Sequence, residues 1–215
     1  MAVIVPTITT DSPEVFAQSL QTFSGFTKRV QIDVSDGSFA PTTTVPLQGM
    51  SVPEGLTVDL HLMSARPSEH LPEILALKPS LCILHAEADD DLASVFQELK
   101  EAGIKTGVAL VKTTFPGRVN ELLAQVDHAM IFAGDLGRQG GAADMMQAEK
   151  VPLLKAVKSS LEIGWDGGAN LSNVRAIAHA GVEVINVGSA ITNADDPAEM
   201  YQALITESEK KGVLI

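Results

Sequence analysis

Three short runs of the chain alternate apolar and polar residues with a period of two. Residues 30–35 read VQIDVS, residues 58–63 read VDLHLM and residues 161–166 read LEIGWD. Because successive side chains of a strand point to opposite faces, each run predicts a strand with one apolar face and one polar face. Burying ionisable groups costs several kcal/mol unless they are paired, hydrogen-bonded or bound to a metal. The pattern therefore indicates a functional site that three strands share.

Strand-like and helix-like segments alternate along the whole chain. The helix-like segments begin with capping residues and a proline, as at Ser12-Pro13 and Asp196-Pro197, and one of them ends before Gly103. Segment 38–55 has the weakest pattern and predicts only a short helix or a long loop. The predicted strands are residues 3–8, 30–35, 56–63, 81–85, 106–111, 127–133, 161–165 and 183–187.

Most of these strands are nearly continuous apolar runs, as expected for a parallel sheet that is covered on both faces. Eight alternating units within 215 residues leave little room for insertions. An α/β fold of the compact (β/α)8 TIM-barrel type, forming one domain over residues 1–215, fits best, and an open doubly wound sheet is the alternative. In such a barrel the active site lies at the carboxyl ends of the strands, and we expect the polar residues of the three runs there.

Composition narrows the choice of partner. The net charge of -12 argues against nucleic acid as a binding partner, because its phosphates would be repelled by the acidic surface. For the same reason, an anionic ligand would have to be bound by local backbone amides or by a few cations. Cys82, the single cysteine, lies in an apolar run and predicts a buried thiol in a reducing compartment. No apolar segment approaches the length of a membrane span, so we expect a cytoplasmic protein that does not contact a membrane.

Five motifs in order along the chain carry a resemblance to a known family. They are Val5-Pro6-Thr7-Ile8, the segment Gln31 to Gly37, the segment Asp59 to Met63, Trp165-Asp166-Gly167-Gly168, and Gly188 to Ile191. In this arrangement the chain resembles the ribulose-phosphate 3-epimerase family over nearly its whole length. The resemblance implies an isomerase that inverts carbon three of a ketose phosphate, with D-ribulose 5-phosphate and D-xylulose 5-phosphate as the default pair.

Asp33 and Asp166 match the two proton-transferring residues of that family. The reaction removes a proton next to a ketone and returns it to the other face, so it needs one base and one acid on opposite sides of an enediolate. The residues themselves agree, because both carboxylates face inward from strands that are not neighbours. Enclosure should also raise their proton affinity toward the value that a base needs at neutral pH.

The resemblance also implies a divalent metal that is held by two histidines and the two aspartates. This chain supplies Asp33, His61 and Asp166, but Gln31 replaces the first histidine. A glutamine carbonyl binds hard cations but lacks the imidazole nitrogen that favours zinc, iron or cobalt. The set is therefore compatible with Zn, Mn, Fe, Co or Mg, or with no metal.

Substrate contacts are expected around the same strands. The family lines its pocket with three methionines, and the matching positions here are Ser35, Met63 and Phe132. Glycine-rich turns let backbone amides approach a phosphate. The residues expected to bind the sugar phosphate are Thr7, His61, Met63, Gly137, Arg138, Gln139, Gly140, Gly167, Gly168, Gly188 and Ser189.

Lys112 keeps a second function open. It follows the fifth predicted strand, where the family has Asn-Pro, and a lysine there suits a solvated loop, a phosphate contact or a Schiff base. The alternative to the epimerase is thus a divergent phosphate-binding barrel with lost or changed activity, such as a lyase that uses Lys112. The resemblance also implies homo-oligomers.

Overall fold

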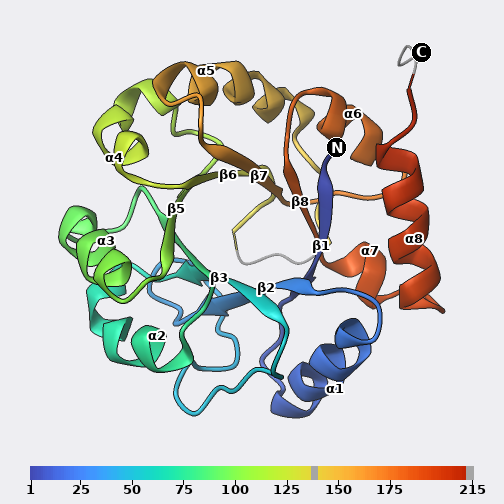
Figure 1. Cartoon of the computed structure of the whole chain (residues 1–215), viewed down its shortest axis with the longest axis horizontal. Coiled ribbons are helices and arrows are strands. Elements are labelled where there is room, and N and C mark those ends of the chain that lie inside the picture. The colour runs from blue at the N-terminus through green and yellow to red at the C-terminus, as the bar shows by residue number, and fades with distance from the viewer. Residues whose placement is uncertain (137–139, 212–215) are drawn as a thin grey trace.

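The computed structural model describes residues 1–136 and 140–211. Within these residues eight parallel strands close into a barrel in chain order, with β1 hydrogen-bonded to both β2 and β8 (Figure 1). The strands are β1 (Val3–Ile8), β2 (Arg29–Ser35), β3 (Thr57–Met63), β4 (Leu81–His85), β5 (Lys105–Leu110), β6 (His128–Phe132), β7 (Glu162–Asp166) and β8 (Val184–Val187). The predicted (β/α)8 barrel is confirmed, and each strand starts and ends within one residue of its expected position.

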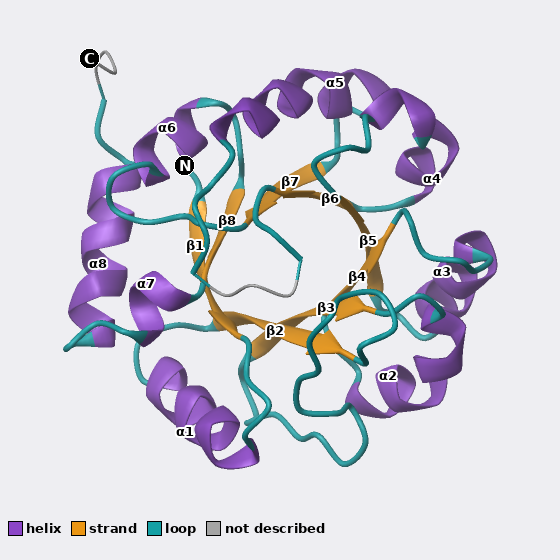
Figure 2. Cartoon of the chain, turned by 180° about the vertical axis from the view of Figure 1, so that it is seen from behind, coloured by secondary structure: helices purple, strands orange, loops and turns teal. Residues whose placement is uncertain are grey.

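Helices surround the ring of strands, as the views from both sides show (Figures 1 and 2). The α-helices are α1 (Pro13–Ser24), α2 (Leu71–Leu77), α3 (Leu92–Glu101), α4 (Asn120–Gln125), α5 (Lys150–Val157), α6 (Val174–His179), α7 (Ser189–Thr192) and α8 (Pro197–Ser208). Short 3-10 turns are η1 (Pro67–His70), η2 (Pro116–Arg118) and η3 (Met145–Glu149). In the described part of the chain, no helix has the length and apolar character that a membrane crossing requires.

Local sequence explains where the longest helices begin. The Ser12 side chain accepts a hydrogen bond from the Val15 amide at the start of α1, and Asp196 accepts from the Ala198 and Glu199 amides at the start of α8.

The segment between β2 and β3 holds no helix among its described residues. It is a loop that turns back on itself through a bridge between Asp36 and Thr43, which confirms the loop alternative for residues 38–55.

The apolar residues form two layers, one on each side of the barrel wall. Val30, Ile32 and Val34 pack outward against the helices in the larger cluster, together with Cys82, which is fully buried as expected. The interior cluster is small and consists of Leu81, Ile83, Ala109, Met130 and Phe132 on β4, β5 and β6. The remaining interior, along β2, β3 and β7, is polar, as the period of two predicted.

Candidate active site

A cavity of about 380 Å³ opens at the carboxyl ends of the strands. Gln31 and His61 do not line this cavity, because both are fully buried behind its floor. Gly137, Arg138 and Gln139 lie outside the described residues. The other expected site residues line it together: Thr7, Asp33, Met63, Gly140, Asp166, Gly167, Gly168, Gly188 and Ser189.

Asp33 and Asp166 meet on the floor of the cavity although their strands are not neighbours. Their side chains are only 10% and 13% exposed, so both carboxylates lie largely out of water. The amide nitrogen of Gln31 bridges them, donating to Asp33 Oδ1 at 2.9 Å and to Asp166 Oδ2 at 2.5 Å. Among the described residues, the Gln31 carbonyl oxygen is buried without a hydrogen-bond partner. The amide thus holds the two carboxylates together through its donor end.

The His61 ring lies beneath this pair. Its Nδ1 is 3.0 Å from Asp33 Oδ1 and 3.8 Å from Asp166 Oδ2. One donor atom from each of Asp33, His61 and Asp166 lies within 4.8 Å of the others, a grouping that can hold a metal ion. Burial alone disfavours the charged ring, but the hydrogen bond and charge of Asp33 outweigh burial and raise the pKa of His61.

Asp166 has the proton affinity that a neutral-pH acid or base needs. Burial, followed by the negative charge of Asp33, raises the pKa of the Asp166 carboxyl to about 7. The nearby His61 ring and the Gln31 amide oppose this rise without cancelling it. Two carboxylates in different surroundings, one of them with a raised pKa, form an arrangement suited to proton transfer.

Threonine hydroxyls line the cavity beside the carboxylates. Thr9 Oγ1 donates to Asp33 Oδ2 at 2.6 Å, so Asp33 accepts bonds from both the amide and the hydroxyl. Thr7 Oγ1 is buried and has no hydrogen-bond partner within the described part of the chain. A buried hydroxyl that faces a cavity without a partner is available to a ligand.

Glycine turns form part of the cavity wall. Gly167 and Gly168 have φ angles of 110° and 70°, a region that other residues rarely adopt. A Cβ atom on Gly167 would overlap the backbone at Gly134, and one on Gly168 would overlap the backbone at Ala142 and Ala143. Glycine is therefore required at both positions so that two loop backbones can approach one another beside the cavity.

His85 belongs to the site, although the sequence analysis did not select it. Its Nε2 is 2.9 Å from His61 Nε2, and its Nδ1 is 3.4 Å from Glu87 Oε2. Burial lowers the pKa of His85 to about 4, so the ring is neutral at physiological pH. The sequence does contain a signal for His85. With a period of two, His85 falls on the same face of β4 as Leu81 and Ile83, which point into the barrel.

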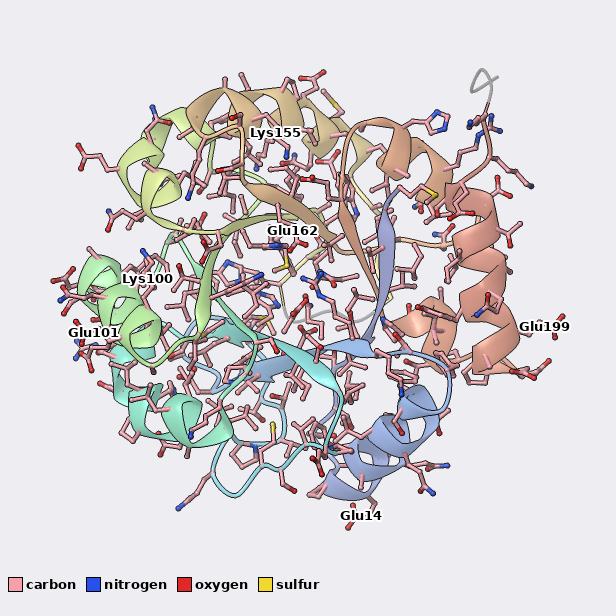
Figure 3. The ribbon with its side chains drawn as sticks, in the orientation of Figure 1. Glu14, Lys100, Glu101, Lys155, Glu162 and Glu199 are labelled. Carbon is pink, nitrogen blue, oxygen red and sulfur yellow. The ribbon has the colours of Figure 1, made fainter. Side chains whose placement is uncertain are left out.

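Asp59 and Glu162 lie at the other end of the barrel, where the sequence analysis did not place them. Both side chains face inward as expected. However, Asp59 precedes His61 by two residues on β3, and Glu162 precedes Asp166 by four residues on β7. Because a strand rises about 3.3 Å per residue, both lie well below the site. Arg29 Nε donates to Asp59 at 2.8 Å, and its terminal nitrogens bind Glu162. Figure 3 shows Glu162 over the middle of the barrel, whereas Glu14, Glu101 and Glu199 extend from outer helices.

Two further positions differ from their family counterparts. Met63 and Phe132 line the cavity, but Ser35 does not. The Ser35 hydroxyl instead donates to the carbonyl of Thr42, in the segment 42–44 that forms part of the cavity wall. Lys112 forms an ion pair with Asp135 and lies outside the cavity lining.

Comparison with known proteins agrees with the motifs. A family model described as the ribulose-phosphate 3 epimerase family matches residues 3–192. The chain belongs to this family. A ribulose-phosphate 3-epimerase from Aquifex aeolicus is 26% identical over 204 residues, which cover 91% of this chain and 92% of the relative. The cytoplasmic isoform of the enzyme from Oryza sativa subsp. japonica is 30% identical over 184 residues, with coverages of 81% and 80%.

Membership of the ribulose-phosphate 3-epimerase family makes the chain an isomerase of the epimerase class, as predicted. Solved structures agree on the fold. A 3-hexulose-6-phosphate synthase from Salmonella typhimurium superimposes with a TM-score of 0.66 at 18% identity over 97% of this chain and 98% of the synthase. A thiamine phosphate pyrophosphorylase from Pyrococcus furiosus gives a TM-score of 0.63 at 16% identity, with 97% of this chain and 95% of the pyrophosphorylase covered.

Proposed function

We propose that the protein interconverts D-ribulose 5-phosphate and D-xylulose 5-phosphate, or the corresponding epimers of a related ketose phosphate. The observation that carries the proposal is the Asp33 and Asp166 pair, two nearly buried carboxylates that face one cavity from strands that are not neighbours, β2 and β7. One carboxylate removes the proton from carbon three, and its electron pair moves into an enediolate. The other then donates a proton to the opposite face of carbon three, so the configuration inverts.

Neighbouring side chains prepare the pair for this exchange. The raised pKa of Asp166 lets one carboxyl stay protonated near neutral pH while the other acts as base. Gln31 and Thr9 donate to the carboxylates from the sides and restrict their rotation. Thr7 offers its unpartnered hydroxyl to the substrate. The reacting groups are therefore oriented before the substrate enters.

A divalent cation fits the donor set of Asp33, His61 and Asp166, whose nearest atoms lie within 4.8 Å of one another. Gln31 presents its amide nitrogen to the carboxylates, and an amide nitrogen does not bind metal, so these three residues would hold the ion. Two carboxylates and one imidazole suit Zn, Mn, Fe, Co or Mg. A bound cation supplies Lewis-acid polarisation of the ketone oxygen.

The glycine wall receives the phosphate in this proposal. Among the described residues that line the cavity there is no lysine or arginine, so the phosphate would be bound by neutral donors, which are the backbone amides of the turns at Gly140, Gly167 and Gly188 and the hydroxyl of Ser189. A site built from backbone groups suits a phosphate on a protein whose net charge is -12.

Solvent deuterium exchange tests the proposal. Each pentulose phosphate is incubated with enzyme in D2O, and deuterium at carbon three is followed by NMR, with wild type compared with Asp33→Asn and Asp166→Asn. Each variant should lose interconversion yet exchange only one epimer, and the two variants should prefer opposite epimers, because each retains the carboxylate on one face. If both variants interconvert the substrates at the wild-type rate, the two-base proposal is wrong.

The structure gives the lyase alternative little support, because Lys112 does not line the cavity itself and its ammonium group is paired with Asp135, a residue of the cavity lining. Borohydride treatment in the presence of substrate, followed by mass spectrometry, would reveal a Schiff base at this residue. The cytoplasmic location and the homo-oligomeric state remain predictions.

A further inference from the structure

The loop between β2 and β3 folds back on the end of β2 beside the cavity. Asp36 pairs with Thr43 through the antiparallel bridge, and the Thr44 amide donates to the Ser35 carbonyl at 3.0 Å. The Ser35 amide in turn donates to the Thr44 hydroxyl at 2.9 Å. Thr42, Thr43 and Thr44 line the cavity and form a threonine wall. The threonine wall is therefore bonded to the strand that carries Asp33.

The Asp36 side chain joins this loop to the segment that follows β3. Its Oδ1 accepts from the Ser38 amide at 2.8 Å and from the Ser38 hydroxyl at 2.6 Å, and its Oδ2 accepts from the Ser64 hydroxyl at 2.6 Å. His70 Nε2 on η1 is 3.0 Å from the same Oδ2, and because a carboxylate only accepts, this nitrogen carries the proton. Four hydrogen bonds from the loop, the end of β3 and η1 thus converge on one carboxylate.

The charge of Asp36 strengthens these contacts. Burial acts to raise the pKa of the Asp36 carboxyl, but its hydrogen bonds from the two serines and from His70 outweigh burial and hold the pKa well below its usual range. The carboxylate is therefore ionised at neutral pH, and bonds to an ionised acceptor are stronger than bonds between neutral groups. The Ser38 hydroxyl extends the network further, since it also accepts from the Ala65 amide at 2.9 Å.

This network connects two parts of the cavity wall. One part is the threonine wall, and the other is Met63 at the end of β3, directly before Ser64. The opposite end of the threonine wall is held separately, because the Val45 amide donates to the Thr10 carbonyl at 2.9 Å. Asp36 itself does not line the cavity, so it affects a bound ligand only through the wall that it holds.

We propose that Asp36, held by Ser64 and His70, is a positioning residue that keeps the threonine wall in place to contact the sugar phosphate. The inference rests on the proposed function only for the identity of that substrate. When the wall is loosened, only the fraction of molecules with an ordered wall binds well, and the apparent affinity falls by that fraction. The loss therefore appears in KM, whereas kcat changes little.

Four variants separate this role of Asp36 from general stability. Asp36→Asn keeps the size of the side chain but replaces one accepting oxygen with an amide nitrogen that only donates. His70→Leu removes the donor on η1, and His70→Gln restores a donor through its side-chain amide. Asp90→Asn is the matched control, because Asp90 Oδ2 also accepts from η1, from the Ser68 amide at 2.7 Å, but lies outside the cavity lining.

The first measurement is hydrogen–deuterium exchange of the Thr44 amide, followed by NMR in the full-length, substrate-free protein. In Asp36→Asn this amide should exchange about 10- to 100-fold faster than in wild type, because a hydrogen bond to a charged group contributes that factor to local stability. His70→Leu should accelerate the exchange about 10-fold. His70→Gln should recover most of this change, and Asp90→Asn should match wild type.

The second measurement is steady-state kinetics with both pentulose phosphates. Asp36→Asn should raise KM about 10-fold, because the substrate must then order the threonine wall itself. The kcat value should stay near that of wild type, and Asp90→Asn should change neither constant. A purely structural role of Asp36 would instead lower the melting temperature and leave the KM of the folded molecules unchanged.

Thr44 exchange at the wild-type rate in both Asp36→Asn and His70→Leu would overturn the inference, and so would faster exchange with an unchanged KM. A failure of the proposed function is distinguishable, because wild type would then interconvert neither pentulose phosphate, and the exchange rates alone would decide the inference. Circular dichroism would identify a variant that does not fold. If Asp36→Asn does not fold, the two His70 variants decide.

Discussion

The two ends of the barrel interior contain similar residues but use them differently. At the amino-terminal end, Arg29 lies between Asp59 at 2.8 Å and Glu162 at 3.0 Å, and His128 also contacts Glu162 at 2.9 Å. At the carboxyl-terminal end, Asp33 and Asp166 share a floor with His61 and the neutral amide of Gln31.

Proton affinity shows the consequence of this difference. Burial acts to raise the pKa of Glu162, but the bonds from His128 and Arg29 outweigh burial and hold it well below its usual range. Asp166 is raised instead, because burial and the charge of Asp33 prevail. The pKa of Asp59 is raised as well, because its burial outweighs the attraction of Arg29. The inward faces of these strands thus hold two different groups. At the amino-terminal end the carboxylates are paired with the Arg29 cation, and at the carboxyl-terminal end two carboxylates lie together and are suited to proton exchange.

The largest expected effect is on activity at the carboxyl-terminal end. Asp166→Asn should lower the interconversion rate about 100- to 10,000-fold, which is the usual contribution of a general acid or base. Because the raised pKa means that folding disfavours the ionised form, the variant should unfold at the wild-type temperature or higher at pH 8. Coupled activity assays and thermal melting measure the two quantities. A marked loss of stability would mean that Asp166 acts as a structural residue, like the amino-terminal network.

At the amino-terminal end the expected effect is on stability. Arg29→Met should lower the free energy of unfolding by about 3–5 kcal/mol, because it leaves the 2% exposed Asp59 side chain without its cation. The reaction rate per folded molecule should stay near that of wild type. Lys155→Met is the control, since its pair with Glu183 is partly exposed and exposed pairs contribute at most about 1 kcal/mol. Urea unfolding decides, and equal losses in the two variants would contradict the comparison.

A smaller loss is expected where the barrel interior is tightly packed. Gly164 on β7 has no side chain because a Cβ atom would overlap the His128 ring, which binds Glu162. Gly164→Ala should therefore displace His128 and destabilise the fold by about 1–3 kcal/mol. Gly117→Ala is the matched control, because no atom lies within 4 Å of its added Cβ. If urea midpoints show no difference between the two variants, the packing argument fails.

The mildest expected effect is a pH dependence of stability at the amino-terminal end. A carboxyl whose pKa is lowered by folding stabilises the protein above its unfolded pKa of about 4.3, and this contribution is lost as pH falls further. For Glu162 the contribution should be lost below about pH 4, and Glu162→Gln should flatten the stability curve there. Unfolding midpoints between pH 3 and 6 test this. The partly exposed surface residue Glu183 supplies the control as Glu183→Gln.

The period of two predicted which side chains face inward but not which end of the barrel they reach. Asp59 and Glu162 were expected near the site for this reason, and their membership of the Arg29 network corrects that expectation. The same pattern could have identified His85, but a mostly apolar run concealed it. Thr9 had no distinguishing signal, since its bond to Asp33 depends on how β1 and β2 lie side by side.

The sequence by itself determined the strands, the barrel, the family and the two carboxylates, because periodicity and short motifs are local properties of the chain. Tertiary structure decided everything that depends on distance between strands. It brought Gln31, Asp33, His61 and Asp166 together, and it separated Asp59 from them. Proton affinities belong to this second group, since burial and neighbouring charges arise only when strands far apart in the chain meet in one interior.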